Sequence, residues 1–414
     1  MSSSTYLRFV ASNRRFIAFG FFAAFASSFG QTYFIGTFGP SIEAEFQLSH
    51  TSWATYYLIG TLASAFLLPW TGKRIDRMPL RRYTVLTLIT LCAGALVLSS
   101  ARNAALLVFA IFLLRQSGQG LMSHISSTSM ARYFDAGRGR AIALASLGFA
   151  AGEACLPILA FASIAAIGWR WTFVGVAGLL VFILLPLLAW LLSGHEKRHQ
   201  EHLTKLSDEA GTENIQRSWS YQEVLRDHRF YLLLPGILAP ALIVTALFFT
   251  HLSLAEAKGW SGTWITGSYL IYAAATTVVA LFCGPLIDRA GGVRLVPFML
   301  IPMAGALIVI GSIQSHWAVV PYFIALGCSL GIAQTAVSAM WAELYGVACL
   351  GSIKSLVTAL AVLSSALGPV IMGGLRDFGY SIETVCLGFA AYACLATGLL
   401  FIALRTQIYF PNEK

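Results

Sequence analysis

Long apolar runs follow one another along this chain, and they limit its fold more than any other feature. A helix needs about 20 apolar residues to cross the hydrocarbon core of a bilayer, and the chain offers twelve such stretches. Charged residues make up only 11% of the sequence and the mean hydropathy is +0.73, more than a water-soluble core requires. We therefore predict an all-α membrane protein with twelve transmembrane helices. The stretches are 16–40, 53–71, 83–100, 104–130, 141–165, 169–193, 229–252, 263–283, 295–313, 318–340, 353–375 and 383–404.

One long polar segment, 194–228, interrupts these runs and predicts three parts: an N-terminal six-helix bundle (1–193), a cytoplasmic linker (194–228) and a C-terminal six-helix bundle (229–414). His195, His199 and His202 follow a helical spacing in the linker. Charged residues stand between them, which favours a solvated helix over a metal site. The seven cysteines form no C-x-x-C pair, and we expect neither a metal nor a cofactor.

Lysine and arginine predict the orientation, because they are retained on the cytoplasmic side of a membrane. With the N-terminus inside, 22 of the 27 fall on the inner side. The outer loops hold Arg102, Arg170, Lys258 and Arg376. We therefore expect a multi-pass protein of the inner (plasma) membrane with both termini cytoplasmic. The net charge of +9 is spread over short loops, which excludes a nucleic-acid partner of the usual kind.

A repeat relates the two predicted bundles. The loops Gly72-Lys-Arg-Ile-Asp-Arg and Gly284-Pro-Leu-Ile-Asp-Arg lie 212 residues apart, and the same offset relates further residues without a gap. Two repeats around a site near the membrane midplane are an architecture of transporters. The pairs are Gly72 and Gly284, Asp76 and Asp288, Arg77 and Arg289, Tyr57 and Tyr269, and Pro157 and Pro369.

On these loops the whole chain resembles the major facilitator superfamily, whose signature loop joins spans two and three. The resemblance implies a fold of two pseudo-symmetric six-helix bundles that moves a small solute by alternating access. It also implies that the loop residues Gly72, Asp76, Arg77, Gly284, Asp288 and Arg289 form gates. The alternative is that these basic loops only fix topology.

Three further motifs look similar to the monocarboxylate and oxalate/formate branch of that superfamily. They are Tyr133-Phe134 with Gly137-Arg-Gly-Arg-Ala141, the stretch Gly168-Trp-Arg-Trp171, and Gly368-Pro369 with Gly373-Gly-Leu-Arg-Asp377. This resemblance implies transport of a small organic anion.

Two ionisable residues fall near the membrane midplane, where a charge is costly unless it has a function or a partner. At 1.5 Å per residue, Arg115 lies about 17 Å beyond the predicted outer entry of span four, and Glu153 lies about 18 Å beyond the predicted inner entry of span five. They either form an ion pair, or Glu153 exchanges a proton while Arg115 holds an anion. The stretch Arg115-Gln-Ser-Gly-Gln-Gly120 also resembles the superfamily's span-four motif, whose arginine is tied to proton coupling. Gly148 and Gly152 predict a close helix approach beside Glu153.

Other polar residues in the spans are candidates for lining a central cavity, although hydrogen bonds between helices explain each equally well. Gln119 lies one α-helical turn from Arg115. His251, near the outer end of span seven, is either a pH-sensitive group or an interfacial histidine. The remaining candidates are Gln31, Tyr33, Tyr269, Tyr272 and Gln334.

The sequence contains no nucleotide-binding motif and no catalytic constellation, so we expect no enzyme. We predict a monomeric secondary transporter in the lipid bilayer that carries a small organic anion with proton coupling. The alternative is an exporter of amphipathic drugs or metabolites by proton antiport.

Overall fold

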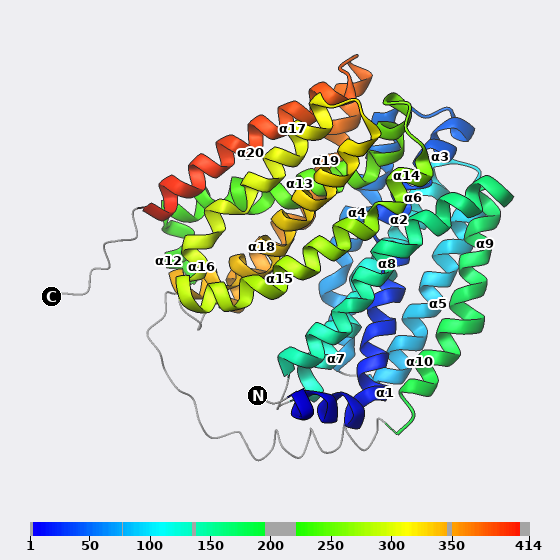
Figure 1. Cartoon of the computed structure of the whole chain (residues 1–414). Helices are drawn as coiled ribbons and strands as arrows, with labels where there is room; N and C mark the ends of the chain where they lie inside the picture. Colours follow the sequence, from blue (N-terminus) through cyan, green and yellow to red (C-terminus); the bar gives the residue numbers. More distant parts are fainter. Residues whose placement is uncertain (1–2, 77, 135–137, 195–220, 346–349, 406–414) are drawn as a thin grey trace. The chain divides into compact units, whose positions relative to one another are not determined.

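The computed structural model describes residues 3–76, 78–134, 138–194, 221–345 and 350–405. Within those residues the chain is helical, with short turns and no β-strand (Figure 1). It forms two compact units. The first comprises Met1–Ile42 and Tyr56–Asn214, and the second comprises Glu43–Thr55 and Ile215–Lys414. The linker histidines lie outside the described residues, and the predicted boundaries at 193 and 228 stay a prediction.

The first unit contains the helices up to residue 191 apart from the segment Glu43–Thr55, with α1 packed against α7 and α8, and α5 against α6 and α9. Helix α4 begins in the second unit and continues in the first. The elements are α1 (Ser3–Ser27), η1 (Ser28–Gly30), α2 (Thr32–Gly36), α3 (Gly39–Phe46), α4 (His50–Gly72), η2 (Lys73–Asp76), α5 (Leu80–Ser99), α6 (Ala104–Leu114), the π-helix η3 (Arg115–Met122), α7 (Ser123–Tyr133), α8 (Arg138–Ile167), α9 (Trp169–Leu179), the π-helix η4 (Leu180–Leu184) and α10 (Leu185–Leu191).

The second unit contains the later helices, with α15 packed against α18, α13 against α19, and α17 against α20. The predicted prolines Pro157 and Pro369 both lie inside helices, α8 and α19. The elements are α12 (Tyr221–Arg226), α13 (His228–Ala257), α14 (Gly262–Gly267), α15 (Tyr269–Ala290), α16 (Gly292–Leu295), η5 (Val296–Phe298), α17 (Leu300–Ser312), η6 (His316–Ala318), α18 (Val319–Tyr345), α19 (Leu350–Asp377) and α20 (Ile382–Arg405).

Ten helical segments among the described residues are long and apolar enough to cross a membrane. The predicted spans 16–40 and 53–71 are not among them. The first is interrupted, and its helix α1 begins ahead of the predicted span and includes Arg14 and Arg15. The second, α4, carries Thr55, Tyr56 and Thr61, which lower its hydropathy.

The first predicted span is a broken helix. Helix α1 ends at Ser27, a single 3-10 turn follows, and Gln31 adopts an extended conformation with φ −84° and ψ 156°. Helix α2 then begins at Thr32. Because a break frees backbone groups that lipid cannot satisfy, it is tolerated only where protein or a cavity surrounds it. Ser28, Phe29 and Gly30 are all buried.

Glycines allow this break to pack closely against its neighbours. A Cβ on Gly30 would lie 2.1 Å from the carbonyl oxygen of Leu114, and one on Gly118 would lie 2.7 Å from Gly30 Cα. Gly148 and Gly152 bring α8 equally close to the first span. A Cβ on Gly148 would lie 2.0 Å from the carbonyl oxygen of Phe21, and a Cβ on Gly152 would lie 2.0 Å from Ser28 Oγ. The predicted close approach at Gly148 and Gly152 is confirmed.

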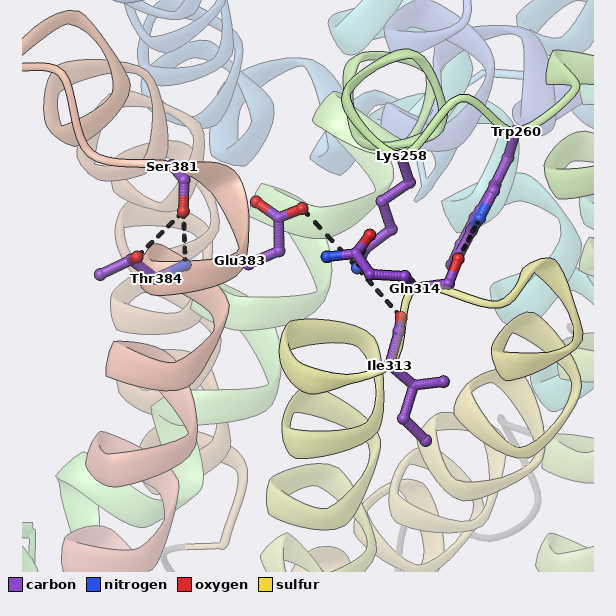
Figure 2. Close-up of polar contacts among 7 residues, drawn as sticks. All are labelled: Lys258, Trp260, Ile313, Gln314, Ser381, Glu383 and Thr384. Carbon is purple, nitrogen blue, oxygen red and sulfur yellow. Dashed lines mark hydrogen bonds and ion pairs between the residues drawn. The ribbon is translucent and has the colours of Figure 1, made fainter.

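Two of the cations predicted in outer loops bind the ends of helices. Figure 2 shows Lys258 Nζ donating to the carbonyl of Ile313 (3.1 Å) and approaching the Glu383 carboxylate (3.7 Å). Arg170 donates to the carbonyls of Ser99 and Ala101, both at 2.7 Å. Ala101 and Ile313 are 212 residues apart, and each follows the C-terminus of a helix, α5 or α17. The carbonyl of each accepts a hydrogen bond from a cation, which is favourable at the negative end of a helix.

The second unit also fixes the start of α4. Asp377, the last residue of α19, accepts hydrogen bonds from the backbone N–H (2.9 Å) and the hydroxyl (2.5 Å) of Thr51. This is the bonding pattern of a helix N-cap, supplied by a carboxylate distant in sequence. The ring of Trp53 stacks on Phe249 at 5.5 Å between centroids. The segment Glu43–Thr55 therefore packs with the second unit although its neighbours in sequence belong to the first.

Replacing Gly30 with alanine tests the close crossing at the break. We expect Gly30→Ala to lower the free energy of unfolding by about 1–3 kcal/mol, because the added methyl meets rigid backbone. Thermal unfolding in detergent measures the change. Gly175→Ala is the matched control, since nothing lies within 4 Å of a Cβ there. Equal stability of the two variants would contradict the crossing.

Replacing Lys258 tests whether the outer cations stabilise the structure. We expect Lys258→Met to cost about 1 kcal/mol, since its charged donor is enclosed and bound to a helix-end carbonyl. Arg102→Met is the control, because Arg102 is an exposed outer cation with no hydrogen bond in the described part of the chain. If both variants unfold at the same temperature, the role of Lys258 is limited to topology.

Candidate functional site

Arg115 is the centre of the candidate site. It is the first residue of η3, and its side chain is only 1% exposed. Its Nη1 donates to the carbonyl of Gly30 (3.2 Å) and to Thr32 Oγ1 (3.4 Å). The arginine in span four therefore binds the broken part of span one, and it is buried where an unsatisfied charge is costly.

Other atoms of the same guanidinium lack an acceptor. Within the described residues, Arg115 Nε and Nη2 are buried and have no hydrogen-bond partner. The face of the guanidinium lies against Tyr57, with Cζ 5.1 Å from the ring centroid. The Tyr57 hydroxyl and Thr32 Oγ1 are 2.6 Å apart. Nη1 of Arg115 therefore has two acceptors, whereas Nε and Nη2 have none among the described residues.

Glu153 lies on α8, which packs against α1, η1 and α2. Its side chain is half-buried, and its carboxylate is within electrostatic range of the Tyr33 hydroxyl. Among the described residues, no ion pair of 4 Å or less joins Glu153 to Arg115. The sequence left two alternatives, an ion pair between these residues or separate roles in binding and proton exchange. The ion pair is not formed in this conformation.

The three predicted glutamines have different surroundings. Gln31 is the extended residue at the break and is half-buried, Gln119 is half-buried in η3, and Gln334 in α18 is exposed. The described part of the chain shows no hydrogen bond from any of these three side chains. Gln119 does not follow the α-helical spacing from Arg115, because η3 is a π-helix with i→i+5 bonding.

His251, Tyr269 and Tyr322 form a second polar centre in the other unit. The His251 Nδ1 is 2.7 Å from the Tyr269 hydroxyl, and its Nε2 is 2.6 Å from the Tyr322 hydroxyl. The rings of Phe248 and Phe323 pack against the imidazole. His251 is 1% exposed. Two tyrosines thus bond both ring nitrogens, as the alternative of a structural histidine expects, and a pH-sensitive role for His251 stays a prediction.

The two polar centres have one pair of residues that the 212-residue offset relates. Tyr57 and Tyr269 are 212 residues apart, and each is bonded to a polar residue in the preceding span, Thr32 or His251. A residue of the fourth span of the same half, Arg115 or Tyr322, then completes each centre. Tyr272, the next predicted residue, is buried against Phe248. The charge is confined to the first centre.

The predicted gate loops are described only in part. Gly72 ends α4 and Gly284 lies within α15, where Arg289 is exposed. Arg77 and the side chains of Asp76 and Asp288 lie outside the described residues. Their gating role stays a prediction.

Residues outside the predicted set hold both loops. Arg132 of α7 donates to the carbonyl of Ile75 at 3.4 Å. Glu343 of α18 accepts from the backbone N–H groups of Gly292 (2.6 Å) and Val293 (3.0 Å) at the start of α16. Gly291, with φ 84°, turns the chain toward that carboxylate. The glycine pair Gly291-Gly292 was the available sequence signal for this turn.

Comparisons with known proteins agree with this architecture. The family model of the Major Facilitator Superfamily matches residues 20–369. No curated protein sequence matches the chain. Its structure is similar to that of a bacterial homologue of the human lysosomal transporter Spinster, in an inward-facing and occupied conformation. The TM-score is 0.64 at 15% identity, covering 99% of this chain and 100% of the other.

A second similar structure is a variant of the nucleoside transporter NupG, with a TM-score of 0.67 at 12% identity, covering 94% of this chain and 99% of the other. Identities this low indicate a shared fold and leave the substrate open. The predicted monocarboxylate branch is not confirmed. The family match indicates a multi-pass membrane transporter for small molecules rather than an enzyme. The chain belongs to the Major Facilitator Superfamily.

Proposed function

We propose that this protein is a secondary active transporter that moves a small organic anion, monocarboxylate-like in chemistry, by alternating access. The observation that supports this most is the buried guanidinium of Arg115, whose Nε and Nη2 have no acceptor among the described residues. A buried cationic donor without a partner is costly, and an anionic ligand removes that cost. The motifs shared with the monocarboxylate and oxalate/formate branch favour the same substrate class.

Proton coupling is the second part of the proposal. Glu153 is an ionisable residue at membrane depth, on a helix that contacts the broken span beside Arg115. Carboxylates in such positions carry protons in transporters. Its separation from Arg115 supports distinct roles, in which Arg115 binds the anion and Glu153 exchanges the proton.

The proposed architecture has twelve spans in two pseudo-symmetric six-helix bundles, 1–193 and 229–414, joined by a cytoplasmic linker. In this proposal the ten apolar segments are ten of the spans, and the interrupted first span and the more polar α4 are the other two. We place the protein in the inner (plasma) membrane as a monomer with cytoplasmic termini, on the strength of the lysine and arginine distribution. The loop residues Gly72, Asp76, Arg77, Gly284, Asp288 and Arg289 are the proposed gates.

Acid-driven uptake in proteoliposomes tests the anion role of Arg115. The wild-type protein is expected to accumulate labelled lactate or oxalate when the outside is made acidic. Arg115→Gln should lower this uptake about tenfold or more, because it removes charge-assisted hydrogen bonds to the anion. Normal uptake by Arg115→Gln would contradict the proposal. Altered sensitivity of cells to cationic dyes without carboxylate uptake would instead identify the alternative, an exporter of amphipathic compounds.

Replacing Glu153 separates coupling from binding. We expect Glu153→Gln to lose acceleration of uptake by the pH gradient while it retains exchange of labelled for unlabelled anion. The reason is that exchange at equal pH needs no net proton movement. Exchange and gradient-driven uptake are measured in the same vesicles, with Gly175→Ala as the control. A gradient response equal to wild type would exclude Glu153 as the proton carrier.

A further inference from the structure

The available donors of Arg115 form one edge of its guanidinium. Nη1 is occupied by the Gly30 carbonyl and by Thr32. Nε and Nη2, which are buried and lack an acceptor in the described residues, lie side by side on the opposite edge. Their N–H bonds are parallel in a planar guanidinium. The edge therefore matches two coplanar oxygens, as in a carboxylate bound through a pair of parallel hydrogen bonds.

This geometry demands more than a positive charge. A lysine ammonium at the same place is a point charge and lacks the rigid fork that binds two oxygens at once. A site that only neutralised charge would work with either residue. A site that binds a carboxylate through both oxygens requires the arginine.

Neighbouring side chains fix the direction of this edge. Thr32 Oγ1 accepts from Arg115 Nη1 and is paired with the Tyr57 hydroxyl at 2.6 Å. The Tyr57 ring faces the guanidinium with Cζ at 5.1 Å from its centroid. Rotation of the guanidinium would turn Nε and Nη2 away from their present direction and break the contact with Thr32. Thr32 and Tyr57 thus restrain Arg115 without using the available edge.

We propose that the Nε and Nη2 edge of Arg115 binds the substrate carboxylate side-on, and that Thr32 and Tyr57 are positioning residues that hold this edge in place. The inference rests on the proposed function. It adds the binding geometry and assigns a role to Thr32, which the sequence did not indicate, and to Tyr57, which the sequence indicated only as a member of the repeat.

Matched variants at Thr32 test the positioning role. Thr32→Val keeps the shape of the side chain but removes the hydroxyl, and we expect the KM for labelled lactate or oxalate to rise about tenfold with kcat retained. Thr32→Ser keeps the hydroxyl and should restore the wild-type KM. Tyr57→Phe should raise KM by a smaller factor, because the ring remains. Unchanged KM in Thr32→Val, or an equal rise in Thr32→Ser, would overturn the positioning role.

Arg115→Lys tests the side-on geometry. We expect its KM for the same acids to rise about tenfold or more, close to Arg115→Gln, because the charge alone does not reproduce the fork. Wild-type affinity in Arg115→Lys would overturn the inference. Thermal unfolding of each variant in detergent identifies any that fails to fold. The wild-type chain provides a further measurement, in which lactate should compete for uptake and lactamide, its neutral amide, should not.

The results distinguish the inference from the proposed function. If the wild-type protein transports the acids and Arg115→Gln does not, the proposed function is supported. In that case, a wild-type KM in Arg115→Lys and in Thr32→Val would refute only the binding geometry. If the wild-type protein transports no carboxylate while exporting dyes, the proposed function fails and the inference fails with it.

Discussion

The hydrogen bond from Arg115 Nη1 to the carbonyl of Gly30 is the contact on which the interior of the first unit depends. A helix interrupted at membrane depth leaves backbone groups that lipid cannot satisfy, and a buried arginine leaves donors in the same condition. The arginine donates to a backbone carbonyl freed by the break, so this bond lowers the free-energy cost of burying both groups. The contact is possible because Gly30 and Gly118 let the two backbones meet without side chains between them. The position of Arg115, and through it the available guanidinium edge, follows from that crossing.

Much of this arrangement could be predicted from the sequence, but the break could not. Arg115 and Glu153 are rare charges within apolar runs, so their importance is visible in the composition of the spans alone. The break carries only a weak signal, because small and polar residues such as Ser28, Gly30 and Gln31 also occur in unbroken spans and no proline marks the site. Thr32 was missed for the same reason, since a threonine in a span normally bonds to its own helix.

The 212-residue offset read from the sequence relates one residue of each polar centre. Tyr57 and Tyr269 were paired by sequence offset, and each proves to bond a polar partner in the span before it. The partners themselves differ in chemistry, a threonine with an arginine in one unit and a histidine with a tyrosine in the other. The paired tyrosines share a bonding role, whereas the side chains that determine charge differ between the two centres. The second centre is already fully hydrogen-bonded at its histidine, which leaves the unsatisfied donors to the first.

The π-helical conformation of Arg115–Met122 has a consequence for how such chains are compared. Bonding from i to i+5 accommodates one more residue than an α-helix of the same rise, as a single-residue insertion would. The residues of α7 are consequently rotated from the faces that a continuous α-helix through α6 would give them. A related sequence that lacks this extra residue would align with this chain without a visible gap, because the surrounding sequence is so apolar. Beyond that point its helix would present different side chains to the interior. An alignment that matches residues one to one across span four would therefore pair side chains that face in different directions.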